Sequence, residues 1–583
     1  MSSRRPRLPG NARRQPLMWR RARSAWLLAV AVLAGSAVAV PDRAAAAQAP
    51  VRTCASLATV DLSGVDAQVS SAADRTENGV LFCEVKGYLS PNTQFTVLLP
   101  QTTWLGGYLQ QGCGGYCGHS EVNLDEPSRT SLHQAPFEPL RRGEFVVAAD
   151  DQGHAGPGTL WGKEDPMLRV IYGYRSEHDL SRAVKAIVRS YYGSEPSHTY
   201  FDGVSDGGHE ALMLAQRYPQ DFDGILVGSP AHNWTEFAGI YSAWLVRANM
   251  DANGRQILDS AKLPALHAAV MAACADANGV IRDPRACTFD PESIRCPAGV
   301  DRPDCLTAPQ VTAVRALYRG PTYRGRQLYD GGQPYGSELA WDGWLIQPAD
   351  DPGWPADTSA YSLSVGYHKH LAYWRNPPAS FSLSDLRFTP ALYRRLRPLA
   401  GLYDSTNPDL RAFRARGGKI ILYHGWADQG LSPWATTNYY AAVARFMGGY
   451  EAIQSFSRLY MIPGLYHCPS PCGHVPTGDP ATKVDLIDEL VRWVEQGQTP
   501  QEVTFPVSEQ TTGTPLTSLT VAPFNPLAPA PDNRGLNSGY RYLFQRDVDR
   551  PGRELWCRQR GPKLVCSHDR AVGEAPAPRA RTH

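Results

Sequence analysis

The feature that most constrains the fold is a serine between two glycines, Ser205. A strand-like pattern precedes it and a helix-like pattern follows it. Shortly before Ser205, HTYFDG (198–203) contains aromatic and β-branched side chains and predicts a short strand. The residues after it, DGGHEALMLAQRYP (206–219), predict a helix. A sharp turn between the two needs small residues where backbones approach, which Gly203 and Gly207 provide. The segment predicts a nucleophile elbow; the alternative is a plain strand-to-helix turn with an unused serine.

Strands and helices alternate around this serine. Strand signals occur at TQFTVLLP (93–100), EFVVAAD (144–150) and GILV (224–227). Before the elbow, SEHDLSRAVKAIVRSYY (176–192) has one apolar helical face and ends at Gly193. This order predicts the α/β class, with a parallel sheet covered on both faces.

From about residue 233 to 409 the pattern changes to segments rich in Pro, Gly, Trp and Cys. Strand-turn segments return in GGKIILYHGWADQGLSP (417–433) and FSRLYMIPGLYHC (456–468), and a helix signal follows. We therefore expect one α/β core in two chain segments, interrupted by a lid. The expected boundaries are a signal peptide over 1–47, core over 48–233, lid over 234–405, core over 406–569 and a disordered tail over 570–583.

The N-terminus predicts export. Arginines precede an apolar run over 25–40, and alanines follow at 44–47, as in a cleaved signal peptide. A retained membrane anchor is the alternative, since this run is just shorter than a membrane span. The net charge of +2 indicates no nucleic-acid partner. We expect a secreted or periplasmic protein, with no membrane partner after cleavage.

All twelve cysteines follow the signal, and an even number in an exported chain favours disulfides. Their local grouping suggests the pairs Cys54 with Cys83, Cys274 with Cys287, Cys296 with Cys305, and Cys557 with Cys566. An alternative for Cys113, Cys117, Cys468 and Cys472 is a zinc site.

A nucleophile elbow requires an acid and then a histidine later in the chain. Asp428 follows the strand signal KIILYHGWA (419–427) and is the only acid in its loop, and His467 follows RLYMIPGLY (458–466). His467 would take the proton of Ser205, and Asp428 would fix the imidazole tautomer. His474 is the rival base, but it follows a Pro- and Cys-rich turn rather than a strand.

The glycine-rich segment GCGGYCG (112–118) is the candidate oxyanion loop. A glycine-rich turn can bring N–H groups toward a developing oxyanion. A tight turn closed by Cys113 and Cys117 is a compatible alternative.

With these motifs in place, the chain resembles the tannase and feruloyl esterase family of α/β-hydrolases from about Cys54 to Cys566. The segments that carry the resemblance are GCGGYCG (112–118), DDQGH (150–154), YFDGVSDGGHEALMLAQRYPQDFDGILVGSPAHNW (200–234), ILYHGWADQGLSP (421–433) and RLYMIPGLYHC (458–468). The resemblance implies an α/β-hydrolase core with a large inserted lid domain.

The resemblance also implies roles for particular residues. Ser205, Asp428 and His467 would form the catalytic triad, and the N–H groups of Gly114 and Asp206 would form the oxyanion hole. Members of the family often have a cysteine just before the nucleophile, paired with the cysteine after the histidine. This chain has Val204 there, so Cys468 would pair with Cys472 or with a cysteine of the 113–117 loop.

The family commonly carries a structural calcium ion in its lid, in an Asp-rich turn between two cysteines. The corresponding stretch here, CADANGVIRDPRAC (274–287), offers Asp276, Asn278, Asp283 and the carbonyl of Val280. A disulfide-closed turn with solvated acids is the alternative. No organic cofactor is expected.

The resulting prediction is a secreted serine esterase for hydroxycinnamic or gallic types of aromatic ester. Its substrate would be a small aromatic ester or an ester-decorated plant polymer. Trp344 and Trp374 are candidate walls of the acid pocket, or else lid core. The alternative functions are a lipase or peptidase on the same fold and a non-catalytic secreted binding protein.

Overall fold

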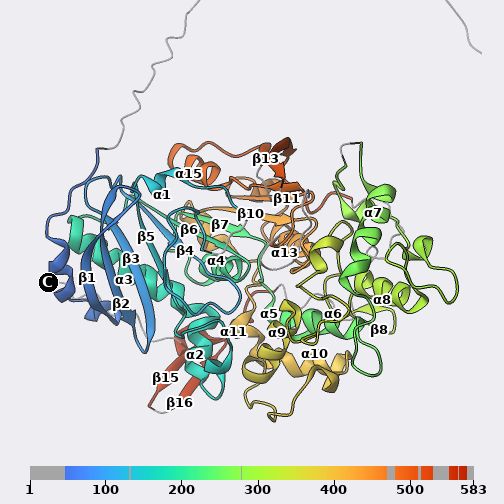
Figure 1. Ribbon diagram of the computed structural model, residues 1–583. Helices are drawn as coiled ribbons and strands as arrows, with labels where there is room; N and C mark the ends of the chain where they lie inside the picture. The colour runs from blue at the N-terminus through green and yellow to red at the C-terminus, as the bar shows by residue number, and fades with distance from the viewer. Residues whose placement is uncertain are drawn as a thin grey trace, which may run out of the picture. The chain divides into compact units, whose positions relative to one another are not determined.

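The largest sheet among the described residues has nine strands, in the order β1-β2-β3-β5-β4-β6-β7-β10-β11 (Figure 1). Its strands are β1 Ala67–Glu77, β2 Val80–Leu89, β3 Thr93–Pro100, β4 Gly107–Gln111, β5 Phe145–Asp150, β6 His198–Val204, β7 Gly224–Gly228, β10 Lys419–Gly425 and β11 Ser457–Ile462. The pairs from β1 to β5 are antiparallel, and every later pair in this order is parallel. The computed structural model describes residues 46–129, 133–277, 279–468, 480–509, 514–529, 550–561 and 563–573.

The parallel strands are buried on both faces. Along β10, Ile420 and Leu422 belong to one core cluster, whereas Ile421 and Tyr423 belong to another. Successive side chains of a strand point to opposite faces, so the two clusters lie on the two sides of the sheet. A strand covered in this way has a continuous apolar run, as the sequence of β10 does. The predicted α/β class is confirmed.

Helices cover both faces of this sheet. Helices α3 (Ser176–Tyr192), α4 (Asp206–Arg217) and α13 (Pro433–Phe446) share the core cluster of Ile420, and α15 (Ile487–Gln496) shares that of Ile421. Helix α3 ends at Gly193, whose φ of 75° is the left-handed conformation that glycine adopts readily. The shorter helices outside the segment between β7 and β10 include α1 Glu138–Arg141, α2 Pro166–Val170 and α14 Tyr450–Ile453.

The segment between β7 and β10 contributes no strand to the central sheet in the part of the chain described. Its described α-helices are α5 Trp234–Glu236, α6 Ala243–Ala248, α7 Leu263–Cys274, α8 Ala308–Arg319, α9 Ser359–Gly366, α10 Pro390–Leu396, α11 Ala400–Tyr403 and α12 Arg411–Ala415. Its only described strands are the two-residue pair β8 (Thr322–Tyr323) and β9 (Arg326–Gln327). Several of these helices are grouped at one side of the picture in Figure 1, coloured green to yellow. The lid limits of 234–405 stay a prediction.

Five disulfides join described cysteines. The four predicted local pairs are confirmed, and Cys113 is bonded to Cys117. The Cys557–Cys566 bond closes the hairpin of β15 (Trp556–Arg560) and β16 (Lys563–Ser567). A three-stranded sheet contains β12 (Pro480–Thr482), β13 (Val503–Glu509) and β14 (Pro515–Val521).

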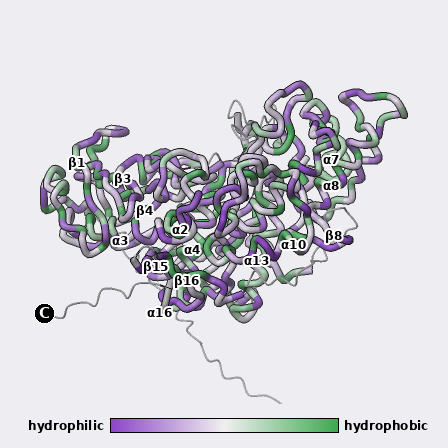
Figure 2. The backbone as a smooth tube through the Cα atoms, turned by 90° about the horizontal axis from the view of Figure 1, so that it is seen from below, coloured by the Kyte–Doolittle hydropathy of each residue, from purple (hydrophilic) through white to green (hydrophobic). Residues whose placement is uncertain are grey.

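The two ends of the chain lie largely outside the described residues. Residues 1–45, which include most of the predicted signal peptide, are among those not described. In the described part, hydrophobic stretches are interrupted at short intervals (Figure 2), and no helix there is long and apolar enough to cross a membrane. At the start of the predicted tail, Arg570–Gly573 forms the short helix α16.

Candidate active site

Ser205 lies on a sharp turn between β6 and α4. Its φ of 65° and ψ of −115° place it outside the regions that non-glycine residues usually occupy. A Cβ added at Gly203 would lie 2.2 Å from the carbonyl oxygen of Gly207, so only glycine fits there. The expected close approach of backbones is therefore present, and it presents the half-buried serine at the carboxyl end of β6.

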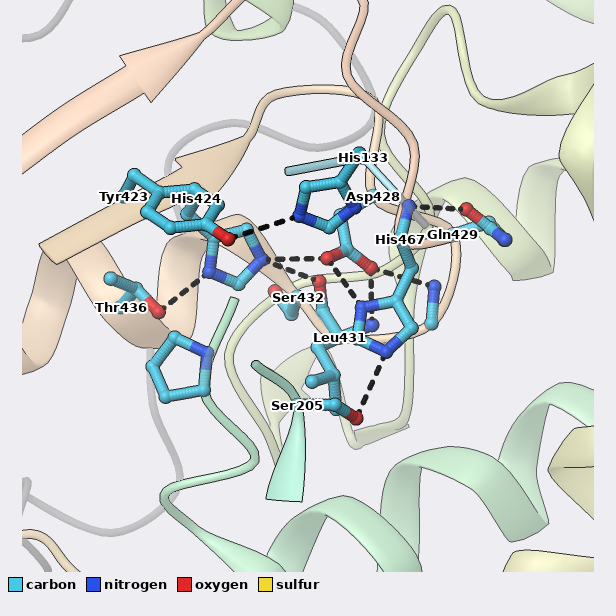
Figure 3. Close-up of polar contacts among 12 residues, drawn as sticks. His133, Ser205, Tyr423, His424, Asp428, Gln429, Leu431, Ser432, Thr436 and His467 are labelled. Atoms are coloured by element: carbon cyan, nitrogen blue, oxygen red, sulfur yellow. Dashed lines mark hydrogen bonds and ion pairs between the residues drawn. The ribbon is translucent and has the colours of Figure 1, made fainter. Parts of the chain in front are cut away.

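A continuous chain of hydrogen bonds leads from Ser205 into the protein (Figure 3). His467 Nε2 lies 3.0 Å from Ser205 Oγ, and His467 Nδ1 lies 2.9 Å from Asp428 Oδ2. Gln429 Oε1 accepts a hydrogen bond from the backbone N–H of His467 at 3.0 Å. Such a chain gives the imidazole a proton to take on one side and a carboxylate to orient it on the other.

Asp428 is fully buried but surrounded by donors. Its Oδ1 accepts from the N–H groups of Gly430 (2.9 Å) and Leu431 (2.6 Å), and its Oδ2 lies 3.2 Å from His424 Nε2. Although burial by itself would raise it, the pKa of Asp428 is held well below its ordinary value by His467 and by hydrogen bonds from His424 and His467. The site therefore contains an ionised carboxylate.

A further histidine, His133, lies beside this network. Its Nε2 lies 3.2 Å from the hydroxyl of Tyr423, as Figure 3 shows. Burial, helped by the charge of His467, lowers the pKa of His133 to about 3. His133 is therefore neutral near pH 7 and adds no positive charge next to His467.

Ser205 and His467 line a cavity of about 550 Å³. Its other walls include Tyr116, Trp234, Phe237, Trp344 and Leu363. The ring of Trp344 lies edge-on to that of His467, with centroids 5.4 Å apart. Among the described lining residues none is Asp, Glu, Lys or Arg, so the cavity suits an uncharged planar group.

The two tryptophans proposed as pocket walls have different positions. Trp344 is buried in the wall of the cavity beside His467. Trp374 has 49% of its surface exposed and lines a separate surface pocket with Arg375 and Lys563. Trp374 is therefore not among the described residues that line the cavity of Ser205.

The glycine-rich loop contributes Gly114 and Gly115 to the same cavity. In the described part of the chain, the N–H groups of Gly114 and Asp206 donate no hydrogen bond. Two unpaired N–H groups, one on this loop and one directly after Ser205, are what an oxyanion hole requires.

The zinc hypothesis does not fit this loop, because Cys113 and Cys117 are joined to each other. Cys468 is disulfide-bonded as well, while Cys472 and the rival base His474 lie outside the described residues. The sulfurs of Cys113 and Cys117 lie instead among the carboxylates of Asp206 and Glu210.

Two of the proposed calcium ligands, Asp276 and Asp283, already have charged partners. Asp276 Oδ2 pairs with Arg282 at 2.7 Å, and its Oδ1 accepts from the N–H of Val280 at 3.1 Å. Asp283 pairs with Arg285 at 2.7 Å. Asn278 lies outside the described residues. The two carboxylates do not fit a calcium site as they stand, because an arginine occupies the position where a cation would bind each of them.

Sequence reasoning missed the groups that hold Asp428 and His467 in place. One of them is His424, near the end of β10 and four residues before Asp428. The Nδ1 atom of His424 lies 2.8 Å from Thr436 Oγ1. The sequence signal that could have identified His424 is its position as a polar residue directly after the apolar run IILY (420–423) of a predicted strand.

The fold is shared with solved esterases. Feruloyl esterase B from Aspergillus oryzae has a TM-score of 0.67 at 22% identity, over 81% of this chain and 95% of that one. A tannin acyl hydrolase from Aspergillus niger has a TM-score of 0.61 at 18% identity, over 88% and 93%. These likenesses show an α/β-hydrolase-type fold.

Taken with the sequence comparisons, the fold defines a carboxylic ester hydrolase. The chain belongs to the tannase and feruloyl esterase family, whose model matches residues 78–531. An uncharacterized esterase of Xanthomonas campestris pv. campestris is 31% identical over 461 residues, 72% of this chain and 77% of that protein. Mono(2-hydroxyethyl) terephthalate hydrolase of Piscinibacter sakaiensis is 28% identical over 518 residues, 77% and 81% of the two chains. The resemblance inferred from the motifs is thus confirmed.

Proposed function

We propose that this protein is an exported serine esterase that hydrolyses esters of aromatic carboxylic acids, of the hydroxycinnamic or gallic type, through an acyl-enzyme. The observation that carries the proposal is the chain Asp428–His467–Ser205 at the wall of the aromatic cavity. Membership of the family supports an ester as the substrate. The aromatic and uncharged lining supports a planar, neutral acyl group.

In the first half of the reaction, Ser205 Oγ attacks the ester carbonyl and passes its proton to His467 Nε2. Asp428 stabilises the imidazolium and keeps its ring oriented. The negative charge on the carbonyl oxygen is met by the N–H groups of Gly114 and Asp206, each of which can contribute about 3 kcal/mol to the transition state. His467 then gives the proton to the leaving alcohol, and the C–O bond to that alcohol breaks.

In the second half, a water molecule attacks the acyl-enzyme. His467 takes a proton from this water, and the same two N–H groups stabilise the second oxyanion. Collapse of that intermediate returns the proton to Ser205 Oγ and releases the free acid. The chain's own residues supply every proton transfer in this cycle, with no organic cofactor.

Two features support export. The N-terminal 47 residues have the order of a signal peptide, and five disulfides join described cysteines. Mass spectrometry of the protein recovered from outside the cytoplasm, showing a new N-terminus near residue 48, would support this; an intact Met1 would contradict it.

The test is hydrolysis of methyl ferulate and methyl gallate by the purified mature protein. Ser205→Ala is expected to lower kcat by about a thousandfold or more, because the nucleophile is lost. Ser70→Ala, an exposed serine in β1, is the matched control and is expected to retain activity.

The other outcomes separate the alternative functions. Turnover of long-chain esters or amides, but not aryl esters, would identify a lipase or peptidase. Binding of methyl ferulate without turnover would identify a binding protein. Full activity of Ser205→Ala would exclude the proposed nucleophile.

A further inference from the structure

Glu210 belongs to the first turns of helix α4, and its side chain contacts the glycine-rich loop. Its Oε2 accepts a hydrogen bond from the N–H of Cys113 at 3.2 Å. Its Oε1 lies 2.8 Å from Cys113 Sγ and 3.5 Å from Cys117 Sγ. Gln152 Nε2 donates to the same Oε1. The side chain is almost completely buried, at 3% exposure, so these contacts are not shared with bulk water.

The peptide groups on both sides of Cys113 are held by α4. The carbonyl oxygen of Cys113 accepts a hydrogen bond from the N–H of Gly207 at 2.7 Å. In a planar trans peptide the C=O and the next N–H point in opposite directions. The bond from Gly207 therefore turns the N–H of Gly114 away from α4. The preceding peptide, whose N–H is that of Cys113, is held by Glu210.

The backbone of the glycine-rich loop packs closely against the start of α4, which leaves little room for another loop conformation. A Cβ at Gly112 would lie 2.7 Å from Glu210 Oε2 and 2.9 Å from the Cα of Gly207. The N–H of Gly112 donates to the carbonyl oxygen of Asp202 at 2.8 Å. Residues 112–114 thus lie directly on the start of α4. Among the described residues, the carboxyl group of Glu210 accepts a hydrogen bond from the loop backbone, whereas that of Asp206 approaches only the cysteine sulfurs.

We infer that Glu210 is the positioning residue of the oxyanion loop: through the N–H of Cys113 it fixes the direction of the Gly114 N–H toward the substrate carbonyl. This inference rests on the proposed function, because it assigns Gly114 to the oxyanion hole. Glu210 acts through the loop and does not touch the substrate.

The contacts of Glu210 fit a neutral carboxylic acid. Burial, together with the charges of Glu177 and Asp206, raises the pKa of Glu210 well above its ordinary value. A disulfide sulfur accepts hydrogen bonds but has no hydrogen to donate. In the neutral acid, Oε2 accepts from Cys113 N–H while the hydroxyl at Oε1 donates toward Cys113 Sγ. Glutamine has the same shape and is also neutral, so its amide can replace both contacts with Cys113. Gln152, whose Oε1 has no hydrogen-bond partner among the described residues, can turn its amide to accept from the new Nε2.

The experiment compares Glu210→Ala with Glu210→Gln, using methyl ferulate. Glu210→Ala is expected to lower kcat about tenfold to a hundredfold, with KM changed by less than about twofold, because a misplaced donor weakens transition-state binding. Glu210→Gln is expected to restore kcat to within about threefold of the parent. Glu138→Ala, an exposed glutamate in α1, is the matched control.

Inhibition by phenylboronic acid, which forms a tetrahedral adduct on a serine, gives a second readout. If the oxyanion donor is misplaced in Glu210→Ala, Ki should rise by about the factor by which kcat/KM falls. An unchanged kcat and Ki in folded Glu210→Ala would overturn the inference. A loss in Glu210→Gln as large as in Glu210→Ala would also overturn it.

If Glu210→Ala does not fold, Glu210→Gln alone decides: parent-like kcat and Ki support the inference, and a loss overturns it. Ser205→Ala is measured in parallel. Full activity in Ser205→Ala would reject the proposed function and this inference together. Loss of activity there, with an unaffected Glu210→Ala, would reject only the role of Glu210.

Discussion

Two disulfide-closed turns, Cys113–Cys117 and Cys274–Cys287, look alike in the sequence but have different surroundings. Each contains a glycine, and both were candidates for ligand binding. The first turn lies against acids from another part of the chain, Asp206 and Glu210. In the second turn the acids are paired with arginines from the same short stretch. The comparison shows that the partner across the turn, and not the turn itself, decides what the turn can do.

The largest effect on the difference between the two turns is expected from a substitution that displaces the Cys113–Cys117 turn from α4. A Cβ at Gly207 would lie 2.9 Å from the carbonyl oxygen of Cys113, which is backbone and cannot move aside cheaply. Gly207→Ala is therefore expected to lower kcat on methyl ferulate about thirtyfold or more. The control is Gly64→Ala, where nothing lies within 4 Å of the added Cβ. Parent-like kcat in Gly207→Ala would show that the loop position is not critical.

Removing each disulfide separates activity from stability. The replacement of Cys113 and Cys117 by alanine is expected to lower kcat about tenfold, since the loop is then held by fewer contacts. The replacement of Cys274 and Cys287 should leave kcat within about twofold but lower the free energy of unfolding by about 3 kcal/mol, because it opens the longer loop. Kinetics and urea unfolding of both double variants check this. Equal effects on kcat would remove the distinction between the turns.

Asp202, an acid near the first turn, should make the free energy of unfolding depend on pH. Asp202, whose backbone carbonyl holds Gly112, is fully buried, and this burial raises the pKa of its side chain to about 8. The folded state keeps a proton that the unfolded chain releases above about pH 4. The free energy of unfolding should therefore fall as the pH rises from about 4 to about 8.

Asp202→Asn removes this contribution. Urea unfolding at pH 5 and pH 9 should show the variant gaining stability relative to the parent at the higher pH. A difference between variant and parent that is the same at both values would contradict the buried, protonated aspartic acid.

The smallest effect is expected at the second turn. Because Arg282 and Arg285 already pair with its acids, adding EDTA or millimolar Ca²⁺ should shift Tm by less than about 1 °C. A rise in Tm with Ca²⁺ that saturates would show that the arginines yield to the ion. It would restore the calcium prediction for Asp276 and Asp283.

The strands that sequence patterns predicted were those buried on both faces. β3, β5, β6, β7, β10 and β11 all have apolar runs. β1 was missed because most of its residues are exposed or half-buried, so its sequence AQVSSAADRTE has no clear apolar pattern. β4 was missed because its sequence GYLQQ contains Gln110 and Gln111, both fully buried. Those amides are satisfied by distant groups, such as the backbone oxygen of Glu177, which no local pattern reveals.

The sequence by itself determined those features of the fold and site that depend on residues close together in the chain or on the order of motifs along it. These are the elbow around Ser205, the order of Ser205, Asp428 and His467, and the four local cysteine pairs, whose members are separated by at most 29 residues. Tertiary structure alone decided which side chains support the site. Glu210 reaches Cys113 across 97 residues of chain, and Trp344 rather than Trp374 lies beside His467. The physical reason is that such contacts depend on how the sheet and the inserted segment pack, and a local pattern carries no record of that packing.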